Sequence, residues 1–433
     1  MKVLNYLPVA MATALVLFGC QPQSTENKET TAIKPDPDNG NIQLPGNFGA
    51  LVVADSIGRA RHLTVRENGD IYVALENMDK GGGIAALRDT SGDGKADQLS
   101  YFGDYFGTGI DIRDNYLYFA PDSALFRYTF NGDELLPETN FETIVHGLTS
   151  RRQHAAKTFT FDNNGNVYIN IGAPSNACQD PDRTAGVPGQ DPCPILEYAG
   201  GIWRFNAGES GQSQEDGYRY ATGIRNAVAL DWNTSVNTLY ALQHGRDALS
   251  SFWPDLYTDE ESAELPAEEF FLVEDGADFG WPYCYYDPIQ NKKVLSPEYG
   301  GNGEQTGRCD SAENPIMAFP GHWAPNDVLF YTGDQFPEHY RNGAFIAFHG
   351  SWNRAPLEQA GYIVAFVPFE GKQPSGDWEI FAEGFTGVDS LLRPGDARYR
   401  PMGLAQGPDG SLYISDSQNG RIWRVLYEEE NEG

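Results

Sequence analysis

Short runs of apolar and aromatic residues, each preceded by a tight polar turn, recur along most of the chain. In every unit the turn contains Asp, Asn or Gly, and the run that follows has the composition of a β-strand. Helical periodicity is scarce, and 48 glycines with 27 prolines fit a chain with many tight turns. The six clearest units occupy residues 67–75, 113–120, 163–170, 234–242, 341–348 and 408–415.

Six such units at irregular spacing predict an all-β fold, a six-bladed β-propeller with long loop insertions. A decorated β-sandwich would give the same local signals, but a further strand pattern near the C-terminus, in ISDSQNGRIWRVLY, favours the closed propeller. We expect one domain over residues 44–433, because no second polar linker divides it. The main insertion is expected from Gly245 to about Pro325, and a shorter one between Asn176 and Gly200.

The N-terminal residues have the pattern of an exported lipoprotein. Lys2 is followed by an apolar run from Val9 to Phe18 and then by Gly19 and Cys20. A charged start, a short apolar core and small residues describe an export signal, and Leu-x-Gly-Cys is the pattern at which bacterial lipoproteins are lipidated. Residues 1–19 are therefore predicted to be a lipoprotein signal peptide, although an ordinary signal peptide with an incidental cysteine is an alternative.

The sequence after the predicted cleavage site favours a protein held at a membrane only by its lipid. Residues 20–43 are polar and proline-rich, so we expect a disordered tether. No other segment is apolar for long enough to cross a bilayer. We expect the protein to be exported and lipid-anchored to the bacterial membrane through Cys20, on the periplasmic face of the outer membrane.

The remaining four cysteines form an even set, which favours disulfides in an exported protein. Proximity in the sequence favours the pairs Cys178–Cys193 and Cys284–Cys309, although four cysteines allow three pairings. A zinc site is the weaker alternative, since neither pair has the usual close spacing.

The formal net charge of −31, from 61 acidic and 30 basic residues, argues against a nucleic-acid partner. Against that acidic background, arginines gathered in one place would be significant. Arg225 and Asn226 lie between GYRYATG and AVAL, where a guanidinium could bind a carboxylate or stabilise charge on oxygen. A structural Arg225 that ties two blades together is the alternative.

Two loop segments carry further candidate chemistry. His154, after Gln153 and before a strand pair, could act as a general base near neutral pH, although a lone histidine commonly bonds only to its own loop. In LQHGRDAL, Gly245 and Arg246 could present carbonyl oxygens to calcium, a cation that prefers oxygen ligands. Asp247, Glu268 or Glu269 could add carboxylates.

Together these segments resemble the PQQ-dependent glucose/sorbosone dehydrogenase family of soluble quinoproteins. The resemblance extends from about Val52 to Tyr427, and its most specific parts are RQHAAKTFTFDNNGNVYINIG, GIRNAVAL, EEFFLVEDGADFGWPYC and GAFIAFHGSWNRAP. AFHGSWNR and DFGWPYC are similar to the sorbosone-dehydrogenase-like branch. The resemblance implies a six-bladed propeller that binds PQQ and Ca²⁺ and passes electrons to a periplasmic quinone or cytochrome.

The resemblance also implies roles for individual residues. His154 would take the proton from the sugar hydroxyl, and Arg225 would stabilise the oxygen charge that develops on the quinone. The residues implied to contact PQQ are Arg61, Gln153, Arg225, Asn226, His349 and Arg400, and the carbonyls implied to bind calcium are those of Gly245 and Arg246. Glucose-type enzymes have lysine at the position of His349 and proline at that of Arg246, which makes glucose itself a doubtful substrate.

The function expected from this resemblance is oxidation of an aldose or a related sugar aldehyde. A calcium-dependent lactonase on a similar propeller is one alternative, and it would have no need of the Arg225–Asn226 pair. A lipid-anchored binding propeller without chemistry is another, for which His154 would be dispensable.

Overall fold

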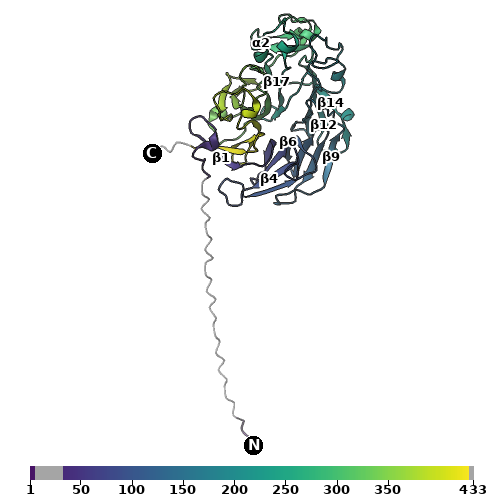
Figure 1. Ribbon diagram of the computed structural model, residues 1–433. Helices are drawn as coiled ribbons and strands as arrows, with labels where there is room; N and C mark the ends of the chain where they lie inside the picture. Colours follow the sequence, from purple (N-terminus) through teal and green to yellow (C-terminus); the bar gives the residue numbers. More distant parts are fainter. Residues whose placement is uncertain (5–32, 429–433) are drawn as a thin grey trace. The chain divides into compact units, whose positions relative to one another are not determined.

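The structure is a computed structural model that describes residues 1–4 and 33–428. Within residues 33–428, six antiparallel sheets are arranged as blades around a channel (Figure 1), which confirms the predicted all-β six-bladed propeller. The first strand of each blade contacts the first strands of its neighbours and so lines the channel. Apolar side chains of facing sheets pack between the blades and form the core.

The first three blades follow one another along the chain. Blade 1 contains β2 (Ala60–Val65), β3 (Ile71–Leu75), β4 (Ile84–Arg88) and β5 (Gln98–Phe102). Blade 2 contains β6 (Gly107–Arg113), β7 (Tyr116–Pro121), β8 (Leu125–Thr129) and β9 (Phe141–His146), extended by β13 (Gln212–Ser213). Blade 3 contains β10 (Phe159–Phe161), β11 (Asn166–Ile171), β12 (Gly201–Asn206) and β14 (Tyr218–Thr222), extended by β18 (Ala277–Asp278).

The other three blades complete the ring. Blade 4 contains β15 (Ala229–Asn233), β16 (Thr238–Gln243), β17 (Glu268–Val273) and β21 (Met317–Phe319). Blade 5 contains β22 (Pro325–Phe330), β23 (Ala344–Phe348), β24 (Ile363–Val367) and β27 (Glu379–Ala382). Blade 6 contains β28 (Pro401–Gln406), β29 (Leu412–Asp416), β30 (Ile422–Tyr427) and β1 (Phe48–Ala54).

Short elements decorate the loops between these strands. Two hairpins are formed by β19 (Cys284–Asp287) with β20 (Lys292–Leu295) and by β25 (Phe369–Glu370) with β26 (Gln373–Pro374). The α-helices are α1 (Leu249–Phe252) and α2 (Asp259–Glu264). The 3₁₀ helices are η1 (Asn39–Asn41), η2 (Pro194–Glu197), η3 (Gln214–Asp216), η4 (Pro297–Tyr299), η5 (Gly307–Ser311), η6 (Glu338–Tyr340) and η7 (Pro394–Asp396). None of the helices in the described part of the chain has the length and apolar character needed to cross a membrane.

All six predicted strand units are confirmed, and each one leads into the second strand of a blade: β3, β7, β11, β16, β23 and β29. Their turns fold locally because the turn residues satisfy the backbone. Gly165, for example, has φ of 88°, a left-handed conformation that favours glycine. Beside it, the Asp162 carboxylate accepts the N–H groups of Asn164 and Asn166 at 2.8 Å each.

The ring is closed by pairing the first strand of the fold with the last. β1 runs antiparallel to β30, from the pair Phe48 and Tyr427 to the pair Ala54 and Ile422. Figure 1 shows β1, drawn in purple, against the yellow C-terminal strands. Blade 6 is therefore built from both ends of the folded chain.

Residues before the predicted domain boundary at residue 44 already pack into the fold. Ile42 is 4% exposed within the core, and Trp423 Nε1 donates a hydrogen bond to the carbonyl of Gly40 at 3.1 Å. The last part of the expected tether, residues 33–43, therefore packs against blade 6. The remainder of the predicted signal peptide after residue 4, Cys20, and the tether up to residue 32 lie outside the described residues.

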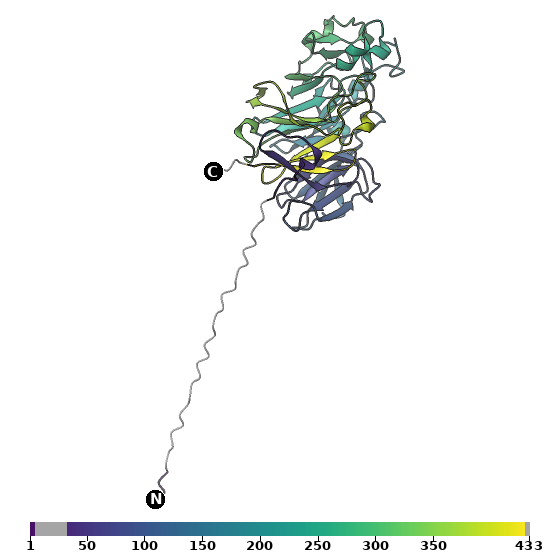
Figure 2. The ribbon, with the colours of Figure 1, turned by 60° about the vertical axis from the view of Figure 1, so that its left-hand side comes forward.

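The predicted main insertion is not one continuous loop. Residues 245–325 include β17 and β21, which are the third and fourth strands of blade 4, so the prediction was wrong in treating the whole range as an insertion. The loops on either side of these strands form the true insertions, and Figure 2 shows their green segment extending beyond the blades. The shorter insertion is confirmed, because β11 ends at Ile171 and β12 begins at Gly201.

Both predicted disulfides are confirmed. Cys178 bonds to Cys193 within the shorter insertion, and Cys284 bonds to Cys309 within the longer one. Each bond closes a loop that lies outside the six blades, so the covalent link restricts segments that blade packing alone does not hold.

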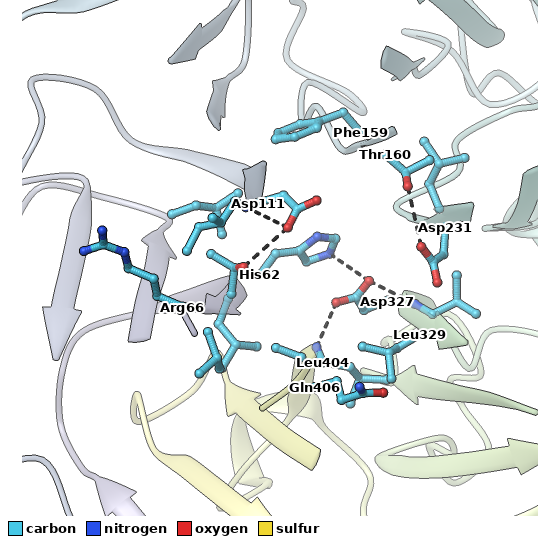
Figure 3. Close-up of a pocket in the computed structure, with 18 of the residues that line it drawn as sticks. His62, Arg66, Asp111, Phe159, Thr160, Asp231, Asp327, Leu329, Leu404 and Gln406 are labelled. Atoms are coloured by element: carbon cyan, nitrogen blue, oxygen red, sulfur yellow. Dashed lines mark hydrogen bonds and ion pairs between the residues drawn. The ribbon is translucent and has the colours of Figure 1, made fainter. Parts of the chain in front are cut away.

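A large cavity of about 680 Å³ lies in the channel (Figure 3), lined by polar side chains from several first strands. Asp231 Oδ2 accepts the N–H of Phe330 in the next blade at 2.9 Å, and Asp327 Oδ2 accepts that of Leu404 at 2.8 Å. Thr64 donates to Asp111 at 3.4 Å in the same manner. These carboxylates hold neighbouring blades together. A structural role therefore explains why they line this cavity.

The burial of these channel carboxyls predicts a pH-dependent stability. Burial raises the pKa of Asp111 and of Asp231 to about 6, so each holds its proton more tightly in the folded protein than in the unfolded chain. Their contribution to stability is present below about pH 4 and is lost as the pH rises through about 6. We expect Asp111→Asn to raise Tm by about 2–4 °C at pH 7, with little change at pH 4. Thermal unfolding across this range tests the expectation.

The matched control for this variant is Asp377→Asn, since Asp377 is exposed. The control should leave the Tm of the protein unchanged at both pH values. A Tm difference for Asp111→Asn that is equal at pH 4 and pH 7 would contradict an electrostatic origin.

Candidate functional site

The candidate residues gather at one end of the channel. His154, Arg225 and Arg400 each lie in the loop that precedes a first strand, before β10, β15 and β28 respectively. Arg61 is the second residue of β2, and His349 follows β23, which runs antiparallel to the first strand of its blade. Because the first strands run in the same direction around a propeller, these positions share one end, while the carboxylates of the large cavity lie further along the strands.

His154 is held as a neutral imidazole with a defined tautomer. Its Nδ1 is bonded to the carbonyl oxygen of Ala173, and since a carbonyl can only accept, Nδ1 carries the hydrogen. Burial and the nearby Arg225 guanidinium lower the pKa of His154 to about 3. Nε2 is therefore left with a lone pair at neutral pH, as a general base requires.

The backbone around His154 is tightly constrained. His154 has φ of 53°, an uncommon left-handed conformation for a non-glycine residue. Gly172 lies beneath it, and a Cβ at Gly172 would come within 2.6 Å of Asn226 Oδ1 and 2.7 Å of His154 Cβ. Only glycine at position 172 lets the imidazole and the Asn226 amide pack together, which explains why these residues are adjacent.

Arg225 is 2% exposed and is surrounded by hydrogen-bond acceptors. Its Nη1 donates to the carbonyl of Gly245 at 2.8 Å, and its Nη2 donates to Asn176 Oδ1 at 3.1 Å. The Nε–H group is buried and has no hydrogen-bond partner among the described residues. This unmet donor is a costly feature in a protein interior, and it fits a site that is completed by a ligand.

The carboxylate of Asp247 connects three segments of the chain around Arg225. Its Oδ2 accepts from Arg225 Nη2 at 2.7 Å and from Arg183 Nη2 at 2.6 Å, and its Oδ1 accepts from Asn353 Nδ2 at 2.9 Å. Burial opposes ionisation of Asp247, yet the guanidinium groups of Arg225 and Arg183 hold its pKa below the usual value. One ionised carboxylate thus fixes side chains from blade 4, the shorter insertion and the loop after β23.

The two carbonyls predicted to bind calcium lie on a fixed turn next to Arg225. Glu268 Oε2 accepts the N–H of Gly245 at 2.8 Å, which sets the orientation of that peptide. The carbonyl of Arg246 accepts no hydrogen bond within the described residues, and the side chain of Arg246 turns away into a buried ion pair with Glu298. A backbone oxygen of this kind fits the oxygen ligands that calcium prefers, although the Gly245 carbonyl also accepts from Arg225.

Arg61 and Arg400 bring positive charge to a group that also contains the neutral imidazole of His349, and these three residues are called the positive group here. Neither arginine makes an ion pair with a carboxylate in the described part of the chain; Arg61 donates to Thr108 Oγ1 at 3.2 Å, and Arg400 Nη2 donates to the Gly350 carbonyl at 2.6 Å. Burial and these two arginines lower the pKa of His349 well below its usual value. In a chain with net charge −31, two partly buried arginines without carboxylate partners favour binding of an anionic ligand.

A smaller cavity of about 120 Å³ lies beside His154 and Arg225, and it is lined by His154, Arg225, His244, Gly245, Asp247, Glu268, His322, Ala324, Ser351 and Asn353. The loop after β23 links this cavity to the positive group. Arg400 donates a hydrogen bond to the Gly350 carbonyl, and the next residue, Ser351, lines the cavity. This volume is smaller than that of most ligand pockets, so a tricyclic cofactor would lie partly outside it.

The predicted site residues differ in how directly they reach this cavity. His154, Arg225 and Gly245 line it, while Asn226 lies behind it, with its Oδ1 accepting from Asn170 Nδ2 at 3.2 Å. Gln153 instead bonds to Asp182 Oδ2 at 2.8 Å, on the shorter insertion. Arg61, His349 and Arg400 form the separate positive group described above.

Sequence reasoning missed Asn176, Asp182, Arg183 and Asn353. Asp182 and Arg183 lie in the loop closed by Cys178 and Cys193, where the polar run PDRT was the available signal, and Asn176 lies two residues before that loop. Nothing in the sequence indicates that Asn353 would meet Asp247, which is 106 residues away.

The fold is that of a class of propellers found in several sugar dehydrogenases. The structure of the pyranose dehydrogenase PQQ domain from Coprinopsis cinerea, in its holo form, has a TM-score of 0.70 and 18% identity, covering 89% of this chain and 97% of that one. A calcium structure of the Trichoderma reesei family AA12 enzyme has a TM-score of 0.73 and 17% identity, covering 93% and 100%. The apo aldose sugar dehydrogenase from Escherichia coli has a TM-score of 0.56 and 17% identity, covering 88% and 100%.

The chain belongs to the TrAA12-like family, whose model matches residues 42–428. A curated relative from Coprinopsis cinerea, a pyrroloquinoline quinone-dependent pyranose dehydrogenase, is 22% identical over 89% of this chain and 54% of its own length. An uncharacterised protein of Borreliella burgdorferi is 29% identical over 48% of each chain. The chain thus spans about half the length of these curated relatives. The predicted kinship with PQQ-dependent sugar dehydrogenases is confirmed, while membership of the sorbosone-dehydrogenase-like branch stays a prediction.

Proposed function

We propose that this protein is a PQQ- and calcium-dependent dehydrogenase that oxidises an aldose or a related sugar aldehyde at C1. The observation that carries the proposal is the positive group of Arg61, His349 and Arg400 at the same end of the channel as a neutral, oriented His154. PQQ is a tricarboxylate, so an acidic protein must concentrate positive charge to bind it. The names of the relatives, which include pyranose, aldose and glucose dehydrogenases, support the same substrate class.

In this proposal each residue acts on a defined group. Bound PQQ supplies the acceptor for the hydride. His154 Nε2 takes the proton of the sugar hydroxyl, because Nδ1 is committed to the Ala173 carbonyl. Arg225 stabilises negative charge on the acceptor oxygen, with Asn226 beside it, and Gln153 supports the loop that carries His154.

The same proposal assigns the binding residues. Arg61, His349 and Arg400 hold the carboxylates, and the carbonyl oxygens of Gly245 and Arg246 bind calcium. Asp247 keeps the Arg225 guanidinium in place. Electrons then pass to a periplasmic acceptor, a quinone or a cytochrome.

The first test is a titration of the metal-stripped protein with PQQ and calcium. Reduction of a redox dye would be followed with a panel of aldoses. We expect activity only when both PQQ and calcium are present, and absorbance of bound PQQ should appear with the same calcium dependence. The panel would also begin to identify the sugar.

Two other results would contradict the proposal. Hydrolysis of a lactone that needs calcium but not PQQ would indicate a lactonase. Absence of both PQQ binding and turnover would leave a binding propeller, with a likeness to the dehydrogenases in scaffold alone.

We further propose that the protein is exported and anchored through a lipid on Cys20. The two disulfides support an oxidising compartment. Fractionation of cells that express the protein and its Cys20→Ser variant tests this proposal. The unaltered protein should fractionate with membranes and the variant with the soluble material; equal distribution of the two would contradict lipid anchoring.

A further inference from the structure

Trp352 differs from the other tryptophans of the chain. The protein has eight tryptophans, and Trp352 is the one whose side chain is mostly exposed, at 66%. The others are buried or partly buried, and those nearest in sequence are packed: Trp323 contacts Phe348 and Trp378 edge to face. Trp352 has no aromatic neighbour within the described residues. A large aromatic ring left in water needs an explanation, because tryptophan is highly buried on average.

The backbone that carries Trp352 is fixed on both sides. Ser351 Oγ donates to the His322 carbonyl at 3.0 Å, and Asn353 Nδ2 donates to Asp247 Oδ1 at 2.9 Å. One residue further on, Arg354 Nη1 donates to the Ala263 carbonyl at 2.7 Å. The exposure of the indole therefore does not come from a loosely attached loop. The segment presents the ring at a defined place.

The backbone of Trp352 lies beside the candidate site. Ser351 and Asn353, the residues on either side of Trp352, both line the cavity that contains His154 and Arg225. The Asn353 Oδ1 atom accepts no hydrogen bond within the described residues. An aromatic face flanked by a hydroxyl and an amide suits a ligand that has both an apolar face and hydroxyl groups.

We propose that Trp352 is the stacking platform for the pyranose ring of the substrate. A pyranose presents C–H groups on the faces of its ring, and these meet the electron-rich face of an indole favourably, as the quadrupole of aromatic rings dictates. The hydroxyls of such a ring can donate to Asn353 Oδ1, because Asn353 Nδ2 is already bonded to Asp247 and leaves Oδ1 without a partner among the described residues. This role rests on the proposed function, and it makes Trp352 a residue that selects cyclic sugars over small open-chain aldehydes.

The kinetic test compares Trp352→Ala and Trp352→Phe with the unaltered protein loaded with PQQ and calcium. For pyranose aldoses, we expect Trp352→Ala to raise KM about tenfold with kcat nearly unchanged, and Trp352→Phe to recover most of the loss. For glyceraldehyde, which has no pyranose ring, KM should change less than about twofold. The matched control is Ile289→Ala, because Ile289 is 72% exposed on the turn between β19 and β20.

A binding measurement separates this role from turnover. The unloaded protein would be titrated with 1,5-anhydroglucitol, a pyranose that lacks the C1 hydroxyl, and the heat of binding would be followed by isothermal titration calorimetry. We expect a saturable change that is lost in Trp352→Ala and kept in Ile289→Ala. Thermal unfolding of each variant checks that the fold is intact.

The outcomes distinguish the two proposals. An active Trp352→Ala variant with an unchanged pyranose KM would overturn the platform and leave the proposed function standing. An equal rise of KM for pyranoses and glyceraldehyde would also overturn it, because the effect would then not depend on the ring. If the unaltered protein oxidises no sugar, the proposed function fails, and the calorimetric titration still decides whether Trp352 binds a pyranose.

Discussion

Replacing His154 is expected to lower turnover about 10²–10⁴-fold, the usual contribution of a general base. The loss should appear in kcat, since His154 acts on the proton of the substrate rather than on the cofactor carboxylates. Steady-state kinetics with the preferred aldose measures it. PQQ binding, followed by absorbance, should remain within about a few-fold of the unaltered protein, because the positive group of Arg61, His349 and Arg400 is separate.

The choice of substitution matters at this position. His154 has φ of 53°, so alanine would add backbone strain to the loss of the imidazole. Asparagine tolerates this conformation better than most residues, and His154→Asn should therefore lose activity while keeping the Tm of the protein. His339→Ala is the matched control, since His339 is about half exposed and pairs only with Glu379 on blade 5. Turnover retained in His154→Asn would remove His154 as the base.

Replacing Arg225 should damage both cofactor binding and rate. Arg225→Lys keeps the positive charge but loses the planar set of donors that reaches Gly245, Asn176 and Asp247 at once. We expect kcat to fall about 10²–10³-fold, as when one donor to a developing oxyanion is removed, together with weaker PQQ binding. Kinetics and a PQQ titration of the same preparation measure the two effects.

A structural role for Arg225 would give a different result. In that case Arg225→Lys would lower the Tm of the protein while the rate per folded molecule stayed unchanged. Arg308→Lys is the control, because Arg308 forms an exposed pair with Asp191 and lies outside the cavity. Loss of rate with an unchanged Tm supports direct action on the reacting groups.

The blades could be predicted because their signal is local. Each hairpin between a first and a second strand carries its own turn residues, so six units were visible without any knowledge of the ring. β17 and β21 were missed for the opposite reason. β17 follows a long loop that contains α1 and α2, and no Asn or Gly turn directly precedes it, so its sequence was assigned to an insertion.

Individual residues of the site could be predicted from the sequence, but the hydrogen-bond network that joins them could not. The resemblance to known quinoproteins identified His154, Arg225 and the positive group, because those residues lie in recognisable motifs. Asp247 was considered only as a calcium ligand, whereas its carboxylate bonds to Arg225, Arg183 and Asn353. These partners come from three separate segments, and only the folded ring brings them together.

The pairing of β1 with β30 has a consequence for biosynthesis. The hydrogen bond from Trp423 to Gly40 joins residues 383 positions apart, so the first strand has no partner until the last one has been made. At a synthesis rate of about 5–20 residues per second, that delay lasts roughly 20–80 s. During this interval the edge of β1 is open to wrong partners, and the nascent chain would need protection from aggregation until its two ends meet.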